Sequence, residues 1–268
     1  MLHKNFILAL ASVVSFASTA CLSPVPELSI AEATLIDLTH TFDEQTVYWP
    51  TAPGFELHSE FEGDTEGGWF YESNTLSTSE HGGTHLDAPV HFAKNAHSTD
   101  QIPLERLVAP AAVIDVAAAC QADRDHAITV SEIKAWEIVH GPLREDEIVL
   151  FRTGFDEYWP DAQNYLGTNQ KGVAGVGLLR FPGLSAEAAT WLAQTRRVAA
   201  VGIDTASLDP GQSKTFLAHR ILFRQNIPGF ENLTALGTLP ARGATMIALP
   251  MKVGSGSGGP LRAIAILP

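Results

Sequence analysis

The segment from His81 to His91, with the sequence HGGTHLDAPVH, constrains this chain more than any other part of it. It contains four side chains that commonly bind metal ions, and two glycines and a proline between them allow tight turns and close backbone approach. Histidines scattered on a solvated loop are the alternative, but this spacing and composition favour a metal site. Because a motif that supplies three ligands leaves coordination positions open for water, the segment predicts a catalytic metal centre of the hydrolase type.

The pattern H-G-G-T-H-x-D-x-P-x-H-F at 81–92 resembles the cyclase family, whose best-known members are bacterial kynurenine formamidases and isatin hydrolases. Those proteins are metal-dependent amide hydrolases. A second stretch, from His219 to Glu231, resembles the family's second site, where a histidine and a downstream glutamate complete the metal centre. Other matching segments occur in the family's order, at 36–40, 49–50, 202–205 and 256–262. The resemblance therefore covers nearly all of the chain after residue 30.

The resemblance implies ligand roles for five residues. His81, His85 and Asp87 would bind a first metal, and Asp87 could bridge to a second. His219 and Glu231 would hold that second metal, with Glu231 also bridging. A carboxylate has two oxygens and can bridge two cations, which is consistent with this division. Taken alone, His219 could equally be a residue on a helix face. The implied cofactor is a divalent metal, zinc or manganese, with one or two ions per chain.

Two further residues would act on the substrate. His91 would be a general acid and base beside the metal, because one imidazole nitrogen cannot both bind a metal and carry a proton. Trp49 would line the substrate pocket, although a core or rim aromatic is the alternative. The implied reaction is hydrolysis of a carbon–nitrogen amide bond by metal-activated water. The small-molecule partner would be an aryl formamide such as N-formylkynurenine or a cyclic aryl amide such as isatin.

Other functions could use the same ligands. An extracytoplasmic cyclase or dehydratase, or a lactone hydrolase, would need the same metal centre. A non-catalytic metal-dependent binding protein is a further alternative, but it has no use for an unligated proton carrier at His91. A serine hydrolase is not indicated, because the chain lacks a G-x-S-x-G elbow and the glycine-serine run at 254–258 is typical of a loop.

The composition limits the partners and the number of domains. The chain has 268 residues, 45% of them hydrophobic, which is enough to bury one full core, and residues 35–268 are expected to form a single domain. Its formal net charge is −13, and it contains no basic cluster longer than Arg196-Arg197. Binding to nucleic acid or to an anionic membrane is therefore not expected, because both require a positive surface. The family resemblance implies a homo-oligomer.

The first twenty residues have the composition of an export signal. His3 and Lys4 precede an apolar run at 6–16, which small residues follow at 17–20. This run is too short to span a membrane comfortably. Residues 1–20 are expected to be removed, residues 21–34 to form a linker, and the mature protein to be exported to the periplasm. Cys21 offers an alternative, which is lipid attachment and anchoring in the cell envelope.

Apolar runs bounded by glycine, proline or charged residues predict six strands, at 35–38, 111–116, 148–152, 198–203, 245–249 and 262–267. Helices are expected at 131–140, with Ser131 as N-cap, and at 185–194, with Ser185 as N-cap. The metal-binding segment is expected to be a loop. This mixture indicates an α/β fold, and the resemblance implies a single-domain swivelling β/β/α arrangement with a mixed sheet or barrel core and flanking helices. The aromatic and acidic segment 155–161 would either cover the pocket or form a solvated loop with buried aromatics.

Overall fold

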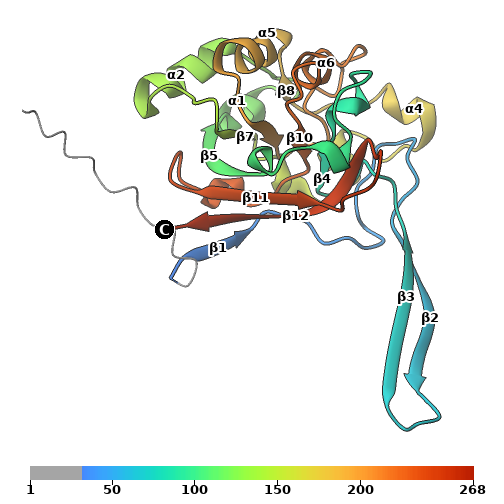
Figure 1. Ribbon diagram of the computed structural model, residues 1–268. Coiled ribbons are helices and arrows are strands. Elements are labelled where there is room, and N and C mark those ends of the chain that lie inside the picture. Colours follow the sequence, from blue (N-terminus) through green and yellow to red (C-terminus); the bar gives the residue numbers. More distant parts are fainter. Residues whose placement is uncertain (1–31) are drawn as a thin grey trace, which may run out of the picture.

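Seven strands close into a barrel in the computed structural model, which describes residues 32–268 (Figure 1). Around the barrel the order is β12, β11, β5, β7, β9, β10 and β4, and β4 pairs back with β12. Pairing is parallel from β5 through β10 and antiparallel elsewhere, and β1 pairs with the end of β12. The strand bounds are β1 Thr34–Asp37, β4 His85–Asp87, β5 Val108–Asp115, β7 Ile148–Arg152, β9 Ala200–Ile203, β10 Gly229–Glu231, β11 Thr245–Pro250 and β12 Gly258–Leu267.

Residues of the barrel strands alternate between two hydrophobic cores. In β7, Ile148 and Leu150 belong to the core inside the barrel, whereas Val149 and Phe151 belong to the core beneath the helices. All four side chains are buried, because successive residues of a strand point to opposite faces and both faces are covered. This explains why β7 is an uninterrupted apolar run and why its bounds agree with the prediction.

Helices cover one side of the barrel (Figure 1). Thr129 caps α2: its hydroxyl accepts a hydrogen bond from the Glu132 N–H, and the Glu132 carboxylate accepts one from the Thr129 N–H. The predicted N-cap at Ser131 is therefore wrong, whereas Ser185 caps α5 as expected. The helix bounds are α1 Ala117–Ala122, α2 Val130–His140, α3 Ala162–Leu166, α4 Gly172–Val176, α5 Ala186–Thr190, continued by a π-helical turn over Trp191–Arg196, and α6 Leu217–Phe223.

The expected α/β fold with a barrel core and flanking helices is confirmed. The expected loop at 81–91 is only partly one, since it contains β4 and ends in a 3-10 turn at Pro89–His91. The export signal at 1–20, Cys21 and most of the expected linker lie outside the described residues. Within the described part of the chain, no helix has the length and apolar character needed to cross a lipid bilayer.

One element stands apart from the barrel, and no apolar pattern in the sequence predicts it. Strands β2 (Glu56–Asp64) and β3 (Phe70–Ser77) form a hairpin that projects from the body (Figure 1). The hairpin is its own two-stranded sheet and pairs with no other described strand. Close to its base, Tyr48 forms a β-bridge with Gly82, so the hairpin departs from the body beside the metal-binding segment.

Candidate metal centre

Strand pairing brings the two predicted halves of the site together. The register places His85 of β4 opposite Glu231 of β10, although the two lie far apart in the sequence. Two glycines allow the chain to reach this register. Gly83 has a φ of +58°, and a Cβ at Gly82 would lie 2.0 Å from a ring atom of Tyr48. The two glycines before β4 are therefore required by the backbone conformation and the close packing at these positions, in addition to the metal-binding side chains around them.

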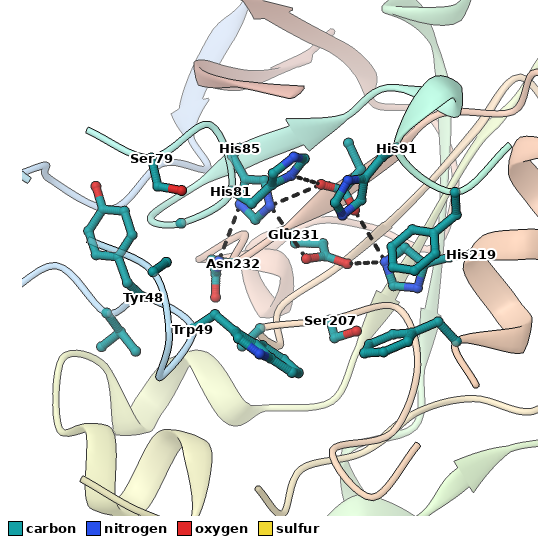
Figure 2. A pocket seen from close by; sticks show the side chains of 17 residues that line it. Tyr48, Trp49, Ser79, His81, His85, His91, Ser207, His219, Glu231 and Asn232 are labelled. Carbon is teal, nitrogen blue, oxygen red and sulfur yellow. Dashed lines mark hydrogen bonds and ion pairs between the residues drawn. The ribbon is translucent and has the colours of Figure 1, made fainter. Parts of the chain in front are cut away.

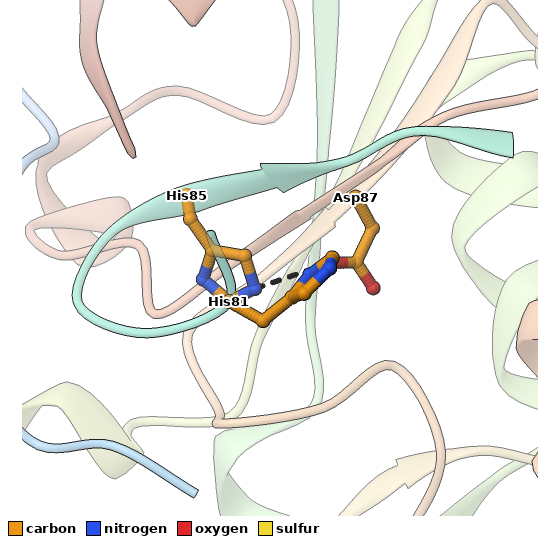
Figure 3. Close-up of side chains that lie close together, drawn as sticks. All are labelled: His81, His85 and Asp87. Carbon is orange, nitrogen blue, oxygen red and sulfur yellow. Dashed lines mark hydrogen bonds and ion pairs between the residues drawn. The ribbon is translucent and has the colours of Figure 1, made fainter. Parts of the chain in front are cut away.

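Four of the predicted ligands, which Figure 2 labels, converge around the fifth, Asp87, which Figure 3 shows beside His81 and His85. Asp87 Oδ1 lies 2.6 Å from His81 Nδ1 and 3.2 Å from His85 Nε2. Asp87 Oδ2 lies 3.2 Å from His219 Nε2, which is 3.0 Å from Glu231 Oε1. Two groups of ligand atoms, one from His81, His85 and Asp87 and one from Asp87, His219 and Glu231, each lie within 4.8 Å of one another. Asp87 belongs to both groups.

Hydrogen bonds outside the centre orient two of the imidazoles. His85 Nδ1 lies 2.9 Å from the carbonyl oxygen of Gly83, and His219 Nδ1 lies 2.6 Å from Asp209 Oδ2. Each Nδ1–H donates to its oxygen, which leaves the Nε2 lone pair directed at the centre. The Asp209 carboxylate also accepts hydrogen bonds from the backbone N–H groups of Ala218 and His219, so it fixes the start of α6 as well as the ring.

These residues fit a divalent cation. His85 Nε2 is buried and has no hydrogen-bond partner among residues 32–268, although it faces Asp87 and Glu231. A buried polar atom without a partner is costly, and a cation would satisfy it. Imidazole nitrogens with carboxylate oxygens suit zinc or manganese, and the shared Asp87 is compatible with one ion or two.

The electrostatics of the centre are those of a cation site. Burial alone would raise the pKa of Asp87, but His81, His219 and His85 hold it well below its usual range. Burial together with the charge of Asp87 raises the pKa of Glu231. Two buried carboxylates at one point repel each other, and a divalent cation between them would remove this repulsion.

The third imidazole is held by a loop near the end of the chain. His81 Nε2 lies 2.9 Å from Ser257 Oγ, and the Ser257 hydroxyl donates to Glu80 Oε2 at 2.5 Å. The Ser257 N–H also donates to the same carboxylate. Gly258 allows this approach, because a Cβ there would lie 2.6 Å from a ring atom of His81. Residues 254–257 of the glycine-serine run therefore form a loop, as expected, while Gly258 begins β12, and Ser257 of this loop contacts the candidate ligand His81.

A cavity of about 300 Å³ opens onto the centre (Figure 2). Trp49 lines it, as expected, and packs against Phe181 and Phe216 with ring centroids 6.4 and 6.2 Å apart. Phe92 lines the same wall, with its ring centroid 5.1 Å from that of Phe216. The cavity is therefore lined by apolar rings and by the polar candidate ligands together, which is the usual construction of a small-molecule site.

His91 also lies in the cavity wall, where its ring stacks on that of His81 at 3.8 Å between centroids. Burial lowers the pKa of His91 to about 4, with the nearby Asp87 opposing this shift. Its ring nitrogens form no hydrogen bond to the described residues. The ring is thus neutral near pH 7 and lies beside the centre, separate from the two ligand groups.

Several site residues escaped the sequence analysis. Asp209 and Phe216 precede His219 by ten and three residues, and Ser257 lies in the matching segment 256–262, but no local pattern marks these side chains as parts of the site. Phe92 was detectable, since it directly follows His91. Residues 232–234, Asn-Leu-Thr, match the N-glycosylation triplet by chance, because Asn232 is buried and donates from Nδ2 to the Gly83 carbonyl oxygen, which leaves no room for a glycan.

The segment 155–161 does not line the cavity. The expected loop with buried aromatics is met only in part: Phe155 is buried and the Trp159 ring stacks on that of His40 with centroids 4.1 Å apart, but Tyr158 is exposed and Phe155–Tyr158 form a 3-10 turn. Asp156 accepts hydrogen bonds from the hydroxyl of Thr234 and the N–H of Ala235. The segment thus supports the turn that follows β10 rather than covering the pocket.

Comparison with known proteins agrees with this geometry. Residues 36–210 match the model of the family described as "Putative cyclase". An isatin hydrolase of Roseibium aggregatum is 33% identical over 257 residues, which cover 90% of this chain and 95% of that protein. A kynurenine formamidase of Salinibacter ruber is 29% identical over 246 residues, covering 86% and 96%. The crystal structure of an isatin hydrolase bound to the product analogue thioisatinate superposes with a TM-score of 0.80 at 33% identity, covering 89% and 94%. This chain therefore belongs to the cyclase family of metal-dependent hydrolases.

Proposed function

We propose that this enzyme, a metal-dependent amidohydrolase like its relatives, hydrolyses a cyclic aryl amide of the isatin class. The observation that carries the proposal is the cavity of about 300 Å³, which the aromatic rings of Trp49, Phe92 and Phe216 line together with the candidate ligands. This volume is at the small end of ligand sites, which favours a compact bicyclic substrate. A planar aromatic ring can stack on that wall while its amide faces the metal centre.

In this proposal, His81, His85 and Asp87 bind one divalent cation, and Asp87, His219 and Glu231 are placed to bind a second. A cation held by these residues would lower the pKa of a coordinated water toward about 7 and would polarise the substrate carbonyl. The reacting atoms would lie next to buried carboxylates and a buried imidazole pair, where electrostatic interactions are stronger than in water.

His91 is the proposed general acid and base. Its ring is neutral near pH 7, because burial lowers its pKa to about 4, so it can accept a proton from the attacking water. The same nitrogen can then return the proton to the departing amide nitrogen. Stacking on His81 limits rotation of the ring and keeps it beside the centre.

A second candidate is hydrolysis of an aryl formamide. It is supported by the kynurenine formamidase of Salinibacter ruber, which matches this chain over most of its length. A lactone hydrolase or a cyclase would use the same ligands, but the aromatic wall gives such substrates no specific advantage unless they carry an aryl ring.

We also propose that the enzyme acts outside the cytoplasm, in the periplasm or anchored in the envelope at Cys21. The order of basic, apolar and small residues in 1–20 supports this. The intact mass of the protein from membrane and soluble fractions would separate cleavage after Ala20 from lipid attachment. A full-length chain in the cytoplasm would contradict both forms of the proposal.

The substrate proposal is tested with metal-stripped protein reloaded with zinc or manganese. The reloaded enzyme is assayed with isatin, N-formylkynurenine, an alkyl lactam and an aryl lactone, and the metal-free protein is the control. We expect the highest kcat/KM for isatin and no turnover without metal. Preference for N-formylkynurenine would establish the second candidate instead, and preference for the lactone would reject both amide proposals.

A further inference from the structure

Asn232 directly follows Glu231 at the end of β10, and it lies in the wall of the metal-facing cavity (Figure 2). The residue is 2% exposed, so its amide is taken out of water. Its φ of +53° is left-handed, a conformation that asparagine adopts more readily than most residues. A buried amide needs partners for both its oxygen and its nitrogen. The contacts of Asn232 therefore show what holds this side chain and what it holds in turn.

The amide of Asn232 joins the end of β10 to the turn that leads into β4. Pairing of the two strands sets Glu231 opposite His85. Beyond this pair, Asn232 Nδ2 donates to the carbonyl oxygen of Gly83 at 2.7 Å. His85 Nδ1–H donates to the same oxygen at 2.9 Å. A carbonyl oxygen has two lone pairs and accepts both bonds, so Asn232 holds the acceptor that orients His85.

The contacts also determine which way the amide points. A flipped amide would place Asn232 Oδ1 2.7 Å from the Gly83 carbonyl oxygen, and two acceptors at that distance repel each other. In the observed orientation, Oδ1 accepts a hydrogen bond from the Tyr165 hydroxyl at 2.8 Å. Nδ2 also lies 3.4 Å from His85 Nδ1, and both of these donors are directed at the oxygen of Gly83.

Tyr165, in α3, supports the amide from behind and is itself 1% exposed. Its hydroxyl lies 3.1 Å from the carbonyl oxygen of Asp204 as well as 2.8 Å from Asn232 Oδ1. Because both neighbours are acceptors, the phenol is the donor. Burial raises the pKa of Tyr165 well above its ordinary range, so the hydroxyl remains protonated near pH 7.

The backbone of Asn232 is fixed on both sides. Its N–H donates to the carbonyl oxygen of Thr205 at 2.9 Å. Its own carbonyl oxygen accepts a hydrogen bond from the Thr84 hydroxyl at 2.6 Å. Thr84 lies between Gly83 and His85, so this second bond ties Asn232 to the same turn that its amide contacts.

We propose that Asn232 is a positioning residue for the candidate ligand His85, and that Tyr165 acts on His85 through Asn232. This inference rests on the proposed metal centre, because the direction of the buried His85 Nε2 matters only if that atom binds a cation. Neither side chain belongs to the two groups of candidate ligands. Loss of either one should therefore weaken the hold on a cation while leaving the ligand set complete.

Two variants and their combination provide the test. Asn232→Gly removes the amide and suits the left-handed backbone, and Tyr165→Phe removes only a hydroxyl. Competition of the purified protein with a chromogenic chelator measures its affinity for zinc. We expect Asn232→Gly to weaken zinc binding about tenfold or more, and Tyr165→Phe roughly threefold. In the double variant, Tyr165→Phe should add nothing, because the amide through which it acts is gone.

A spectrum distinguishes positioning from general support of the fold. Cobalt bound in place of zinc absorbs visible light, and the absorption depends on the geometry of its ligands. We expect Asn232→Gly to shift the cobalt spectrum. Trp136→Phe is the control, since it removes another buried hydrogen bond, from Trp136 Nε1 to Val113 O at 2.8 Å, outside the cavity. It should lower the melting temperature of the metal-free protein and change neither the zinc affinity nor the spectrum.

The outcomes separate this inference from the metal centre on which it rests. Equal zinc affinity in the wild type, Asn232→Gly and Tyr165→Phe would overturn the positioning roles and leave the metal centre in place. Losses that simply add in the double variant would overturn the action of Tyr165 through Asn232. A wild type that binds neither zinc nor cobalt would reject the metal centre and this inference together. Binding is measured without substrate, so the result does not depend on which amide is hydrolysed.

Discussion

Ser257 Oγ lies 2.9 Å from Nε2 of His81, although 176 residues separate the two in the chain. Because His81 Nδ1 faces Asp87 at 2.6 Å, a His81 that binds metal through Nδ1 must carry its proton on Nε2 and donate it to Ser257. The hydroxyl of Ser257 in turn donates a hydrogen bond to the Glu80 carboxylate. The last loop of the chain thus selects the tautomer of a candidate ligand in the first motif.

Ser257→Ala should therefore weaken metal binding without unfolding the protein. Loss of a hydrogen-bond partner behind a ligand typically costs 10- to 100-fold in metal affinity, and we expect a change in that range, about tenfold or more. Competition with a chromogenic chelator measures it. Ser255→Ala, at an exposed position of the same loop, is the matched control. Equal affinity in the two variants would show that Ser257 only fills space.

Glu231→Gln should weaken the ion held with His219 more than the ion held by His81 and His85. The change removes a negative charge that lies 3.0 Å from His219 Nε2, while an amide oxygen can still accept the hydrogen bond from the Leu208 N–H. Metal titration followed by elemental analysis measures the ions bound per chain. Glu187→Gln, an exposed glutamate of α5, is the control. A single ion per wild-type chain would leave a mononuclear centre and reject this division of ligands.

The parts of the fold that could be predicted are those with a local cause. The strand Ile148–Arg152 is apolar on both faces because both faces are buried, so its bounds followed directly from the sequence. The hairpin of β2 and β3 could not be predicted in this way, because both strands are largely exposed and no burial against the rest of the described chain imposes an apolar pattern on them.

The same division applies to the site. His81, His85 and Asp87 lie in one motif, so their chemistry is visible before any folding is considered. Asp209 and Ser257 act through distances that only the closed barrel creates, and an aspartate or serine in a loop carries no signal by itself. A resemblance to a family assigned Glu231 to the same centre as His85, and the pairing of β4 with β10, which sets these two residues opposite each other, supplies the physical reason.

His91→Ala should retain the metal but lower kcat by roughly 10²–10⁴-fold, the usual contribution of a positioned general acid and base. The ring stacks on His81 and lies outside both groups of candidate ligands, so its loss should not empty the centre. Elemental analysis and kcat are measured on the same sample. His97→Ala, a nearby histidine outside the cavity, is the control. Loss of metal from His91→Ala would identify His91 as a ligand.

His40 should make the protein less stable in acid. Burial lowers its pKa to about 4, below the value of about 6.5 in an unfolded chain, so the folded state disfavours the proton. This contribution to stability is present above pH 6.5 and is lost as the pH falls toward 4. His40→Phe keeps a ring on Trp159 but removes the titrating group. The unfolding free energy of this variant should therefore fall less between pH 7.5 and pH 5 than that of the wild type. We expect a difference of about 1 kcal/mol, reduced because His40 is partly exposed. Urea unfolding at both pH values measures this, with His140→Phe as the control; identical losses in wild type and His40→Phe would contradict it.

Trp49→Ala should raise KM for an aryl amide several-fold and lower kcat less. The ring lines the cavity between Phe181 and Phe216, where it can stack on a planar substrate, and such stacking contributes about 0.5–1.5 kcal/mol. This contact persists from the bound substrate to the transition state, so it adds uniform binding and mainly changes KM. Measuring kcat/KM for an aryl amide and a matched alkyl amide in both proteins isolates the ring contact, and Trp191→Ala, a tryptophan outside the cavity, controls for a general loss of packing. If wild type and Trp49→Ala discriminate equally between the two substrates, Trp49 is a structural aromatic and the substrate ring is bound by another part of the wall.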